Sequence, residues 1–255
     1  MTGNVLKMGN KTANRCNGLD CEEISLCDAH IIPQGFARIT RGSDHNVILT
    51  NQKRRTTPQL GEIDSYILCA ACDGALGVFD KALIEAASNF RRVHRNNGTK
   101  WSLPTVSPDA FAKGVFAIFW RASLSQRPDF RNFTLGKAQD DVRDILFGRA
   151  TFADKPYLSL FVQRYKSKRF DVSRVFSDPS LAPFMDRQAA WLSLTGFRFM
   201  ALFDGIEVDQ KSSSRDLTRC GLIHGDYITI EDTLEFKVMS RMMVADMLRA
   251  KDKAG

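Results

Sequence analysis

Two pairs of closely spaced cysteines constrain this chain more than any other feature of its sequence. Four residues separate Cys16 from Cys21, and two residues separate Cys69 from Cys72. Both thiolates of such a pair can bind one ion, and four thiolates form a usual tetrahedral site for structural zinc. The alternative is a set of buried apolar cysteines, but the spacing favours metal. The sequence therefore predicts structural zinc bound by Cys16, Cys21, Cys69 and Cys72.

The composition is that of a globular protein that stays inside the cell. The 255 residues are 44% hydrophobic, which is enough to form a core in one or two domains. Residues 1–13 are polar and lack the apolar stretch of a signal peptide, and nowhere do eighteen apolar residues follow one another. Paired cysteines without a secretory signal are typical of zinc binding in a reducing compartment. We therefore expect a soluble, cytoplasmic protein.

The pattern of apolar residues predicts an α+β fold that begins with a zinc module. A short strand should lead through residues 23–32, with His30 near its end, and a second should lie around residues 64–68. Apolar residues then recur every three or four positions from Leu76 to Phe90, which indicates an amphipathic helix starting at or just after Cys72. Cysteine pair, short strands, second pair and helix together make a treble clef. The predicted organisation is a flexible N-terminus (1–15), a zinc module (16–98) and an α+β domain (105–255).

The second predicted domain mixes helices and strands. Ser107 and Pro108 are typical of the cap and first position of a helix, which should continue through Trp120. We expect Trp120 and the adjacent Arg121 to anchor this half of the chain to the zinc module. The remaining predictions are helices over 138–147 and 234–248, strands over 157–162 and 227–230, and a long apolar β stretch over 191–203.

Basic residues point to a polyanionic partner. The formal net charge is +7, which permits binding to nucleic acid without requiring it. Two local clusters are candidates for phosphate contacts. The alternative for the second cluster is a solvated helix C-terminus, where the helix dipole favours cations. The candidates are Lys53, Arg54 and Arg55 in a polar loop over 41–60, and Arg91, Arg92 and Arg95 at the end of the first helix.

His30 is the candidate catalytic residue. It lies between the two cysteine pairs and close to Pro33, so a zinc-bound fold would hold its ring in one place. A fixed histidine can act as a general base that takes a proton from water attacking phosphorus. A divalent cation with oxygen ligands, Mg²⁺ or Mn²⁺, would neutralise the developing charge. Asp73, directly after Cys72, is placed to provide such a ligand.

The strings AHIIPQGF (residues 29–36) and LCAACD (residues 68–73) resemble the HNH nuclease superfamily, also called ββα-metal or His-Me finger nucleases, in its zinc-binding form. The resemblance implies that His30 is the general base and Asp73 a ligand of the catalytic metal. It also implies an asparagine that orients the base, for which Asn46 and Asn51 are the candidates.

Within that superfamily the chain is similar to a bacterial branch with an HIIP string. It departs from active members at one position and matches the branch at several others. Ala29 stands where active members have an acid that binds the metal. Asp64 and Asp80 match acids of the branch, and the string at Trp120–Ser123 matches a downstream WRAS. Either Asp64 or Asp80 replaces the missing ligand, or the site is inactive.

Two functions of the zinc module are therefore expected from the sequence, and a separate role of the α+β half, such as ligand sensing, is the remaining alternative. The first is an HNH-like endonuclease that hydrolyses phosphodiester bonds in DNA, with structural zinc and a separate catalytic Mg²⁺ or Mn²⁺. The second is a catalytically inactive treble clef that binds nucleic acid or a protein partner.

Overall fold

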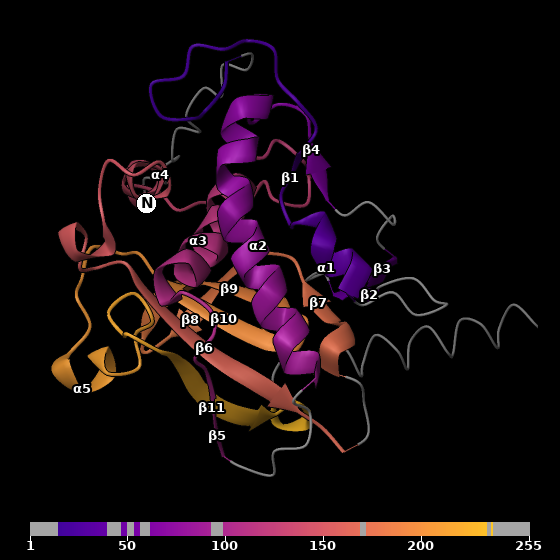
Figure 1. Cartoon of the computed structure of the whole chain (residues 1–255), viewed down its shortest axis with the longest axis vertical. Helices are drawn as coiled ribbons and strands as arrows, with labels where there is room; N and C mark the ends of the chain where they lie inside the picture. The colour runs from indigo at the N-terminus through magenta and orange to yellow at the C-terminus, as the bar shows by residue number, and fades with distance from the viewer. Residues whose placement is uncertain are drawn as a thin grey trace, which may run out of the picture.

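The first part of the fold is a small ribbon of two strands followed by a long helix. The computed structural model describes residues 15–39, 47–49, 54–56, 62–92, 99–168, 172–233 and 236. Strand β1 (Ala29–His30) pairs antiparallel with β4 (Ile63–Asp64), so that His30 lies opposite Ile63. Helix α1 (Gln34–Ile39) follows β1, and helix α2 (Ala70–Arg92) follows β4. Figure 1 shows the ribbon beside α2.

Both predicted strands of the ribbon are shorter than the sequence indicated. Residues 21–28 form no strand because their backbone groups are used elsewhere: Cys16 N–H donates to the Glu23 carbonyl at 2.8 Å, and Cys27 N–H to the Leu68 carbonyl at 2.9 Å. Residues 65–67 form a turn. Helix α2 begins at Ala70, inside the second cysteine pair, so Cys72 and Asp73 belong to its first turn.

A large sheet combines strands from both predicted domains. Within the described residues it has nine strands in the order β3-β2-β7-β9-β10-β6-β11-β5, with β8 paired to β9. Strand β2 pairs parallel with β7 and antiparallel with β3. The prediction of a polar loop over 41–60 was therefore wrong for residues 47–49 and 54–56, which form β2 and β3. The bounds are β2 Val47–Leu49, β3 Arg54–Thr56, β5 Lys100–Leu103, β6 Ser159–Lys166, β7 Val175–Ser177, β8 Ser180–Phe184, β9 Arg187–Leu194, β10 Phe197–Leu202 and β11 Ile223–Thr229.

Two tight turns organise the centre of this sheet. The stretch 191–203, predicted as one β segment, is divided by Thr195 and Gly196, whose φ angles are 49° and 83°. Leu194 and Phe197 on either side are direct partners in the β9–β10 ladder. Two consecutive residues at positive φ match the right-handed twist of a hairpin. Met185 and Asp186, also at positive φ, connect β8 to β9 in the same way.

The helix predicted from Ser107 is confirmed. Helix α3 spans Pro108–Leu124, and the Ser107 hydroxyl accepts a hydrogen bond from Ala110 N–H at 3.3 Å, which is the usual contact of an N-cap serine. Helix α4 (Ala138–Leu146) and the short α5 (Gln210–Ser213) follow, together with 3₁₀ turns at Phe152–Asp154, Val172–Arg174 and Ile230–Asp232. The helix predicted over 234–248 lies outside the described residues, Phe236 excepted.

Helices α2 and α3 cover one face of the sheet (Figure 1). The Phe111 ring of α3 lies 5.9 Å from the rings of Phe197 and Phe199 on β10. One cluster of buried residues runs from Cys16 to Ile223, so the cysteine pairs share their core with the sheet. The fold is α+β, as predicted. None of the helices in the described ranges is both long and apolar enough to span a bilayer.

Candidate metal centre and its neighbouring carboxylates

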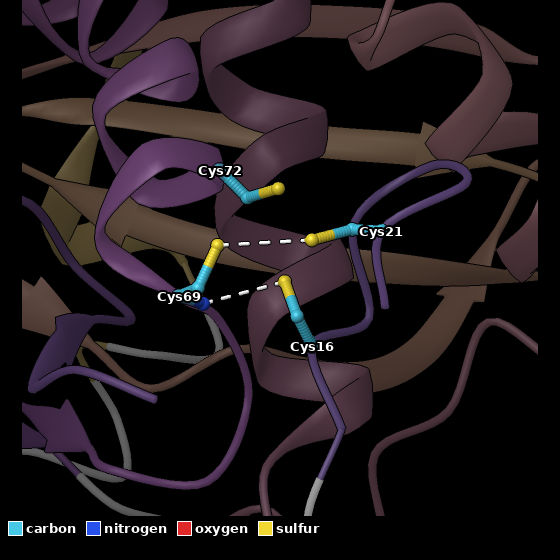
Figure 2. Close-up of side chains that lie close together, drawn as sticks. All are labelled: Cys16, Cys21, Cys69 and Cys72. Carbon is cyan, nitrogen blue, oxygen red and sulfur yellow. Dashed lines mark hydrogen bonds between the residues drawn. The ribbon is translucent and has the colours of Figure 1, made fainter. Parts of the chain in front are cut away.

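The four predicted cysteines converge on one point. Their sulfur atoms all lie within 4.8 Å of one another, and the Sγ atoms of Cys21 and Cys69 are 3.8 Å apart. Figure 2 shows Cys69 and Cys72 on the first turn of α2 or just before it, facing Cys16 and Cys21 on the loop that precedes β1. Cys16 and Cys69 are buried, whereas Cys21 and Cys72 are half-buried.

Backbone N–H groups around the cluster are placed to stabilise a thiolate. The Sγ of Cys16 accepts hydrogen bonds from Gly18 N–H and Cys69 N–H, each at 3.3 Å, and such donors stabilise a thiolate. The loop is fixed to the chain before α2 because Asn17 donates to the Ile67 carbonyl from both its backbone and its side chain. A Cβ at Gly18 would lie only 2.3 Å from the Cys72 Sγ. Gly18 therefore permits the approach of the two segments.

The electrostatics of the cluster fit a divalent cation. Burial raises the pKa of Cys16 and, together with the neighbouring thiols, that of Cys72, whereas the backbone N–H of Cys72 lowers the pKa of Cys69. Four thiolates within this space would repel one another, and a bound cation offsets that repulsion. Four sulfur donors at this spacing are the ligand set that Zn²⁺ prefers. Cys27, outside this ligand set, is half-buried against the same core, and burial raises its pKa.

His30, on β1, and Asp73, directly after Cys72 in α2, each have a buried atom without a hydrogen bond. The atoms are His30 Nε2 and Asp73 Oδ1. Burial raises the pKa of Asp73, and the positive charge of Arg121 opposes that rise. A buried polar atom without a partner is costly. Each of these two atoms can therefore still accept a partner.

Arg121 connects the two long helices at this site. Its side chain is 1% exposed and bonds Asp80 of α2 through two nitrogens, Nη1 to Oδ2 at 3.0 Å and Nη2 to Oδ1 at 2.6 Å. Its Nη1 also lies 3.8 Å from Asp73 Oδ1. The predicted anchoring of the second half of the chain is confirmed for Arg121, whereas the ring of Trp120 packs 5.8 Å from that of Phe147, in the same half. The sequence did not indicate that Asp80 is the partner, because the two residues are far apart along the chain.

The structure assigns protein partners to the other two candidate metal ligands. Asp80 is held by Arg121, as described above. Asp64 is buried, and its oxygens accept hydrogen bonds from Tyr66 N–H at 2.9 Å, the Ser125 hydroxyl at 2.5 Å and Gln126 N–H at 3.1 Å. These bonds join the ribbon to the end of α3. Asp64 and Asp80 thus have a structural reason to be present. Of the three predicted carboxylates, Asp73 is the one with a buried oxygen that accepts no hydrogen bond.

A buried acid near the ribbon was not found from the sequence. Glu62, directly before β4, is 3% exposed and forms a salt bridge with Arg127, whose Nη1 also donates to the Ile63 carbonyl at 3.0 Å. No local pattern identifies this pair, because the two residues are distant in sequence. Together with Asp64 it fixes the strand opposite His30.

Only some of the basic residues predicted to contact phosphate lie in the described part of the chain, and neither of the two candidate asparagines does. Arg54 and Arg55 lie on β3, at the edge of the large sheet, and Arg91 and Arg92 end α2. Lys53, Arg95, Asn46 and Asn51 lie outside the described residues. A phosphate-binding surface therefore stays a prediction.

Comparisons with known proteins add no relative. No family model, no curated protein and no solved structure matches this chain. The cysteine cluster, which could hold a metal such as zinc, is the property of the site that the structure itself supports.

Proposed function

We propose that this protein is a metal-dependent phosphodiester hydrolase of the HNH type that acts on DNA and contains structural zinc. One observation carries the proposal: His30 Nε2 and Asp73 Oδ1 are both buried without a hydrogen-bond partner, on a ribbon and a helix joined by the four cysteines. A base and a metal ligand at a common site need free atoms of this kind. The paired strands β1 and β4, with α2 following β4, also fit the resemblance seen in the sequence.

His30 would perform the proton transfer, and the residues around it would hold it in position. Pairing of β1 with β4 holds the backbone of His30, and the Glu62–Arg127 pair fixes β4. His30 Nε2 would take the proton from the attacking water. Asp73, with Ala29 unable to contribute, would be the carboxylate that holds Mg²⁺ or Mn²⁺. When bound, that cation would neutralise charge on the phosphate and the leaving oxygen.

The four cysteines would hold zinc away from the chemistry. In the proposed enzyme the zinc fixes the start of α2, and so the position of Asp73, relative to the loop before β1. Thiolate ligation fits a reducing compartment, in agreement with the expected cytoplasmic location. The basic residues of β3 and of the end of α2 would contact the DNA backbone.

A second function is favoured by one contact. Arg121 Nη1 lies 3.8 Å from Asp73 Oδ1, so this carboxylate already has a cation nearby. If that contact replaces a metal ion, His30 and Asp73 are structural, and the zinc module binds nucleic acid or a protein partner without cleaving it.

Cleavage of supercoiled plasmid distinguishes these functions. The purified protein is incubated with plasmid in Mg²⁺ or Mn²⁺, together with His30→Ala and Asp73→Asn. Asp109→Asn is the matched control, because Asp109 is the acid in the first turn of α3, as Asp73 is in α2. We expect cleavage by the parent and by Asp109→Asn, and loss of cleavage in the other two.

Zinc content and melting temperature are measured on the same samples. Both should be nearly unchanged in His30→Ala, because this residue donates no hydrogen bond from Nε2 and does not belong to the cysteine cluster. Cleavage that persists in His30→Ala would exclude it as the base. Stoichiometric zinc with no cleavage by the parent protein would favour the non-catalytic module.

A further inference from the structure

A groove of about 730 Å³ lies on the large sheet, and it is separate from the cysteine cluster. Side chains of β6 and β10 alternate between the two faces. Leu160 and Val162 pack in the core under the helices, whereas Phe161 and Met200 belong to a second apolar cluster. Successive residues of a strand point to opposite faces, so the groove lies on the face away from α2 and α3. Its volume is in the range of small-molecule sites.

One end of the groove is apolar and aromatic. Phe161 of β6 and Met200 of β10 are direct neighbours in the ladder, and both are buried. The ring of Phe184, from β8, lies 5.2 Å from the ring of Phe161. These three side chains offer a surface on which a flat ring can pack.

The other end of the groove is charged. It lies where β11 and β5 form the edge of the sheet. Lys100 of β5 lies opposite Asp226 of β11, and Arg215 Nη1 is 3.4 Å from Asp226 Oδ2. Lys100 and Arg215 are exposed. Two cations against one carboxylate leave this end positive, which favours an anionic group on the ligand.

Gln163 lies between the two ends. It is the ladder partner of Asp226 on one side and of Arg198 on the other. Its Oε1 accepts a hydrogen bond from Arg198 Nη1 at 3.0 Å, so its amide nitrogen is the group that can donate to a ligand. An amide N–H on Gln163 can donate to a ring nitrogen or carbonyl at the edge of a heteroaromatic ring.

We propose that this groove binds a small ligand in which a flat heteroaromatic ring is joined to an anionic group, as in a nucleoside monophosphate. The ring packs on Phe161, Phe184 and Met200, and its edge meets Gln163. The anion lies at Lys100 and Arg215. This site is independent of the proposed nuclease activity, since none of its residues belongs to the cysteine cluster or its neighbours.

Calorimetric titration of the full chain with AMP and GMP tests the site. Adenosine, which has the ring without the anion, and ribose 5-phosphate, which has the anion without the ring, should each bind roughly tenfold or more weakly than AMP. The double variant Lys100→Glu/Arg215→Glu should weaken AMP binding roughly tenfold or more, since it reverses the charge at one end. Phe184→Ala should weaken it at the other end. Lys137→Glu, at an exposed position outside the groove, is the control.

The outcomes separate this site from the proposed nuclease site. Binding of AMP should persist in His30→Ala, and circular dichroism should show that the groove variants are folded. The proposal is overturned if neither AMP nor GMP binds saturably at millimolar concentration. It is also overturned if adenosine binds as tightly as AMP, or if the folded groove variants bind AMP like the parent protein.

Discussion

Gly18 controls how closely the two cysteine pairs can approach. It lies in the loop between Cys16 and Cys21, and a Cβ there would be 2.3 Å from the Cys72 Sγ. A separation below 3.0 Å forces a shift, either of the loop or of α2. Either shift moves sulfur atoms that must keep tetrahedral geometry around zinc. Position 18 therefore requires glycine, because there is no room for a Cβ beside the Cys72 Sγ.

We predict that Gly18→Ala lowers zinc affinity roughly tenfold or more, the usual size of effects from residues that position metal ligands. Competition with a chromogenic chelator measures the affinity. Gly74→Ala is the control, because Gly74 lies two residues after Cys72 in α2 and a Cβ there meets nothing within 4 Å. This control should keep its zinc and gain up to about 1 kcal/mol of stability from helix propensity. Equal zinc affinity in both variants would show that the loop adapts freely.

At the residue scale, the sequence predicted the ligands but not their supports. The spacing of Cys69 and Cys72 is local, so it indicated a shared ion without any knowledge of the fold. The contact between Gly18 and Cys72, and the orphan atoms of His30 and Asp73, arise from segments that meet only in three dimensions. Asp64 and Asp80 show the limit: their positions fit metal ligands in sequence, but distant donors bind them in the fold.

At the element scale, helices α2 and α3 pack closely and share a buried ion pair. Gly114 of α3 faces Leu83 and the Phe79 carbonyl of α2 so closely that a Cβ would lie 2.6 Å and 2.7 Å from them. Beside this contact, Arg121 is 1% exposed and Asp80 is 16% exposed. Removing one partner of a buried pair leaves an uncompensated charge, which costs more than removing both.

We predict that Arg121→Met lowers the free energy of unfolding by about 3–5 kcal/mol, because Asp80 is left without its two hydrogen bonds. The double variant Arg121→Met/Asp80→Leu should recover a large part of this loss. Urea denaturation of the parent, both single variants and the double variant gives the coupling energy. If the losses in the two single variants simply add in the double variant, the pair does not stabilise the helix contact.

Local signals explain which elements were predicted. Ser107 and Pro108 mark the start of α3 regardless of its surroundings, and the prediction was correct. The β9–β10 hairpin was missed although Thr195-Gly196 is a turn signal, because the apolar residues on both sides hid it. The pairing of β2 with β7 joins segments far apart in sequence. No local pattern identifies such a pairing, and here it carries a strand of the first half into the main sheet.

At the scale of the whole molecule, the cysteine cluster and the sheet form one core. The cluster of buried residues includes Cys16 and Cys69 at one end and Leu160, Phe197 and Ile223 at the other. The salt bridge of Arg121 and the hydrogen bonds of Asp64 connect the same two parts. A structural metal contributes directly to folding free energy. Its loss should therefore reach beyond the residues that bind it.

Removal of zinc with a chelator should lower the unfolding temperature of the entire chain in one transition. Tryptophan fluorescence reports on this, because Trp101, Trp120 and Trp191 all lie outside the cysteine module. Chelator should shift the tryptophan signal and the far-ultraviolet circular dichroism together. Cys69→Ser should reproduce the shift, whereas Cys220→Ser, which changes a thiol outside the cluster, should not. If chelator lowers the helix content but leaves the tryptophan transition at the same temperature, the two parts unfold separately. The shared core would then not couple them.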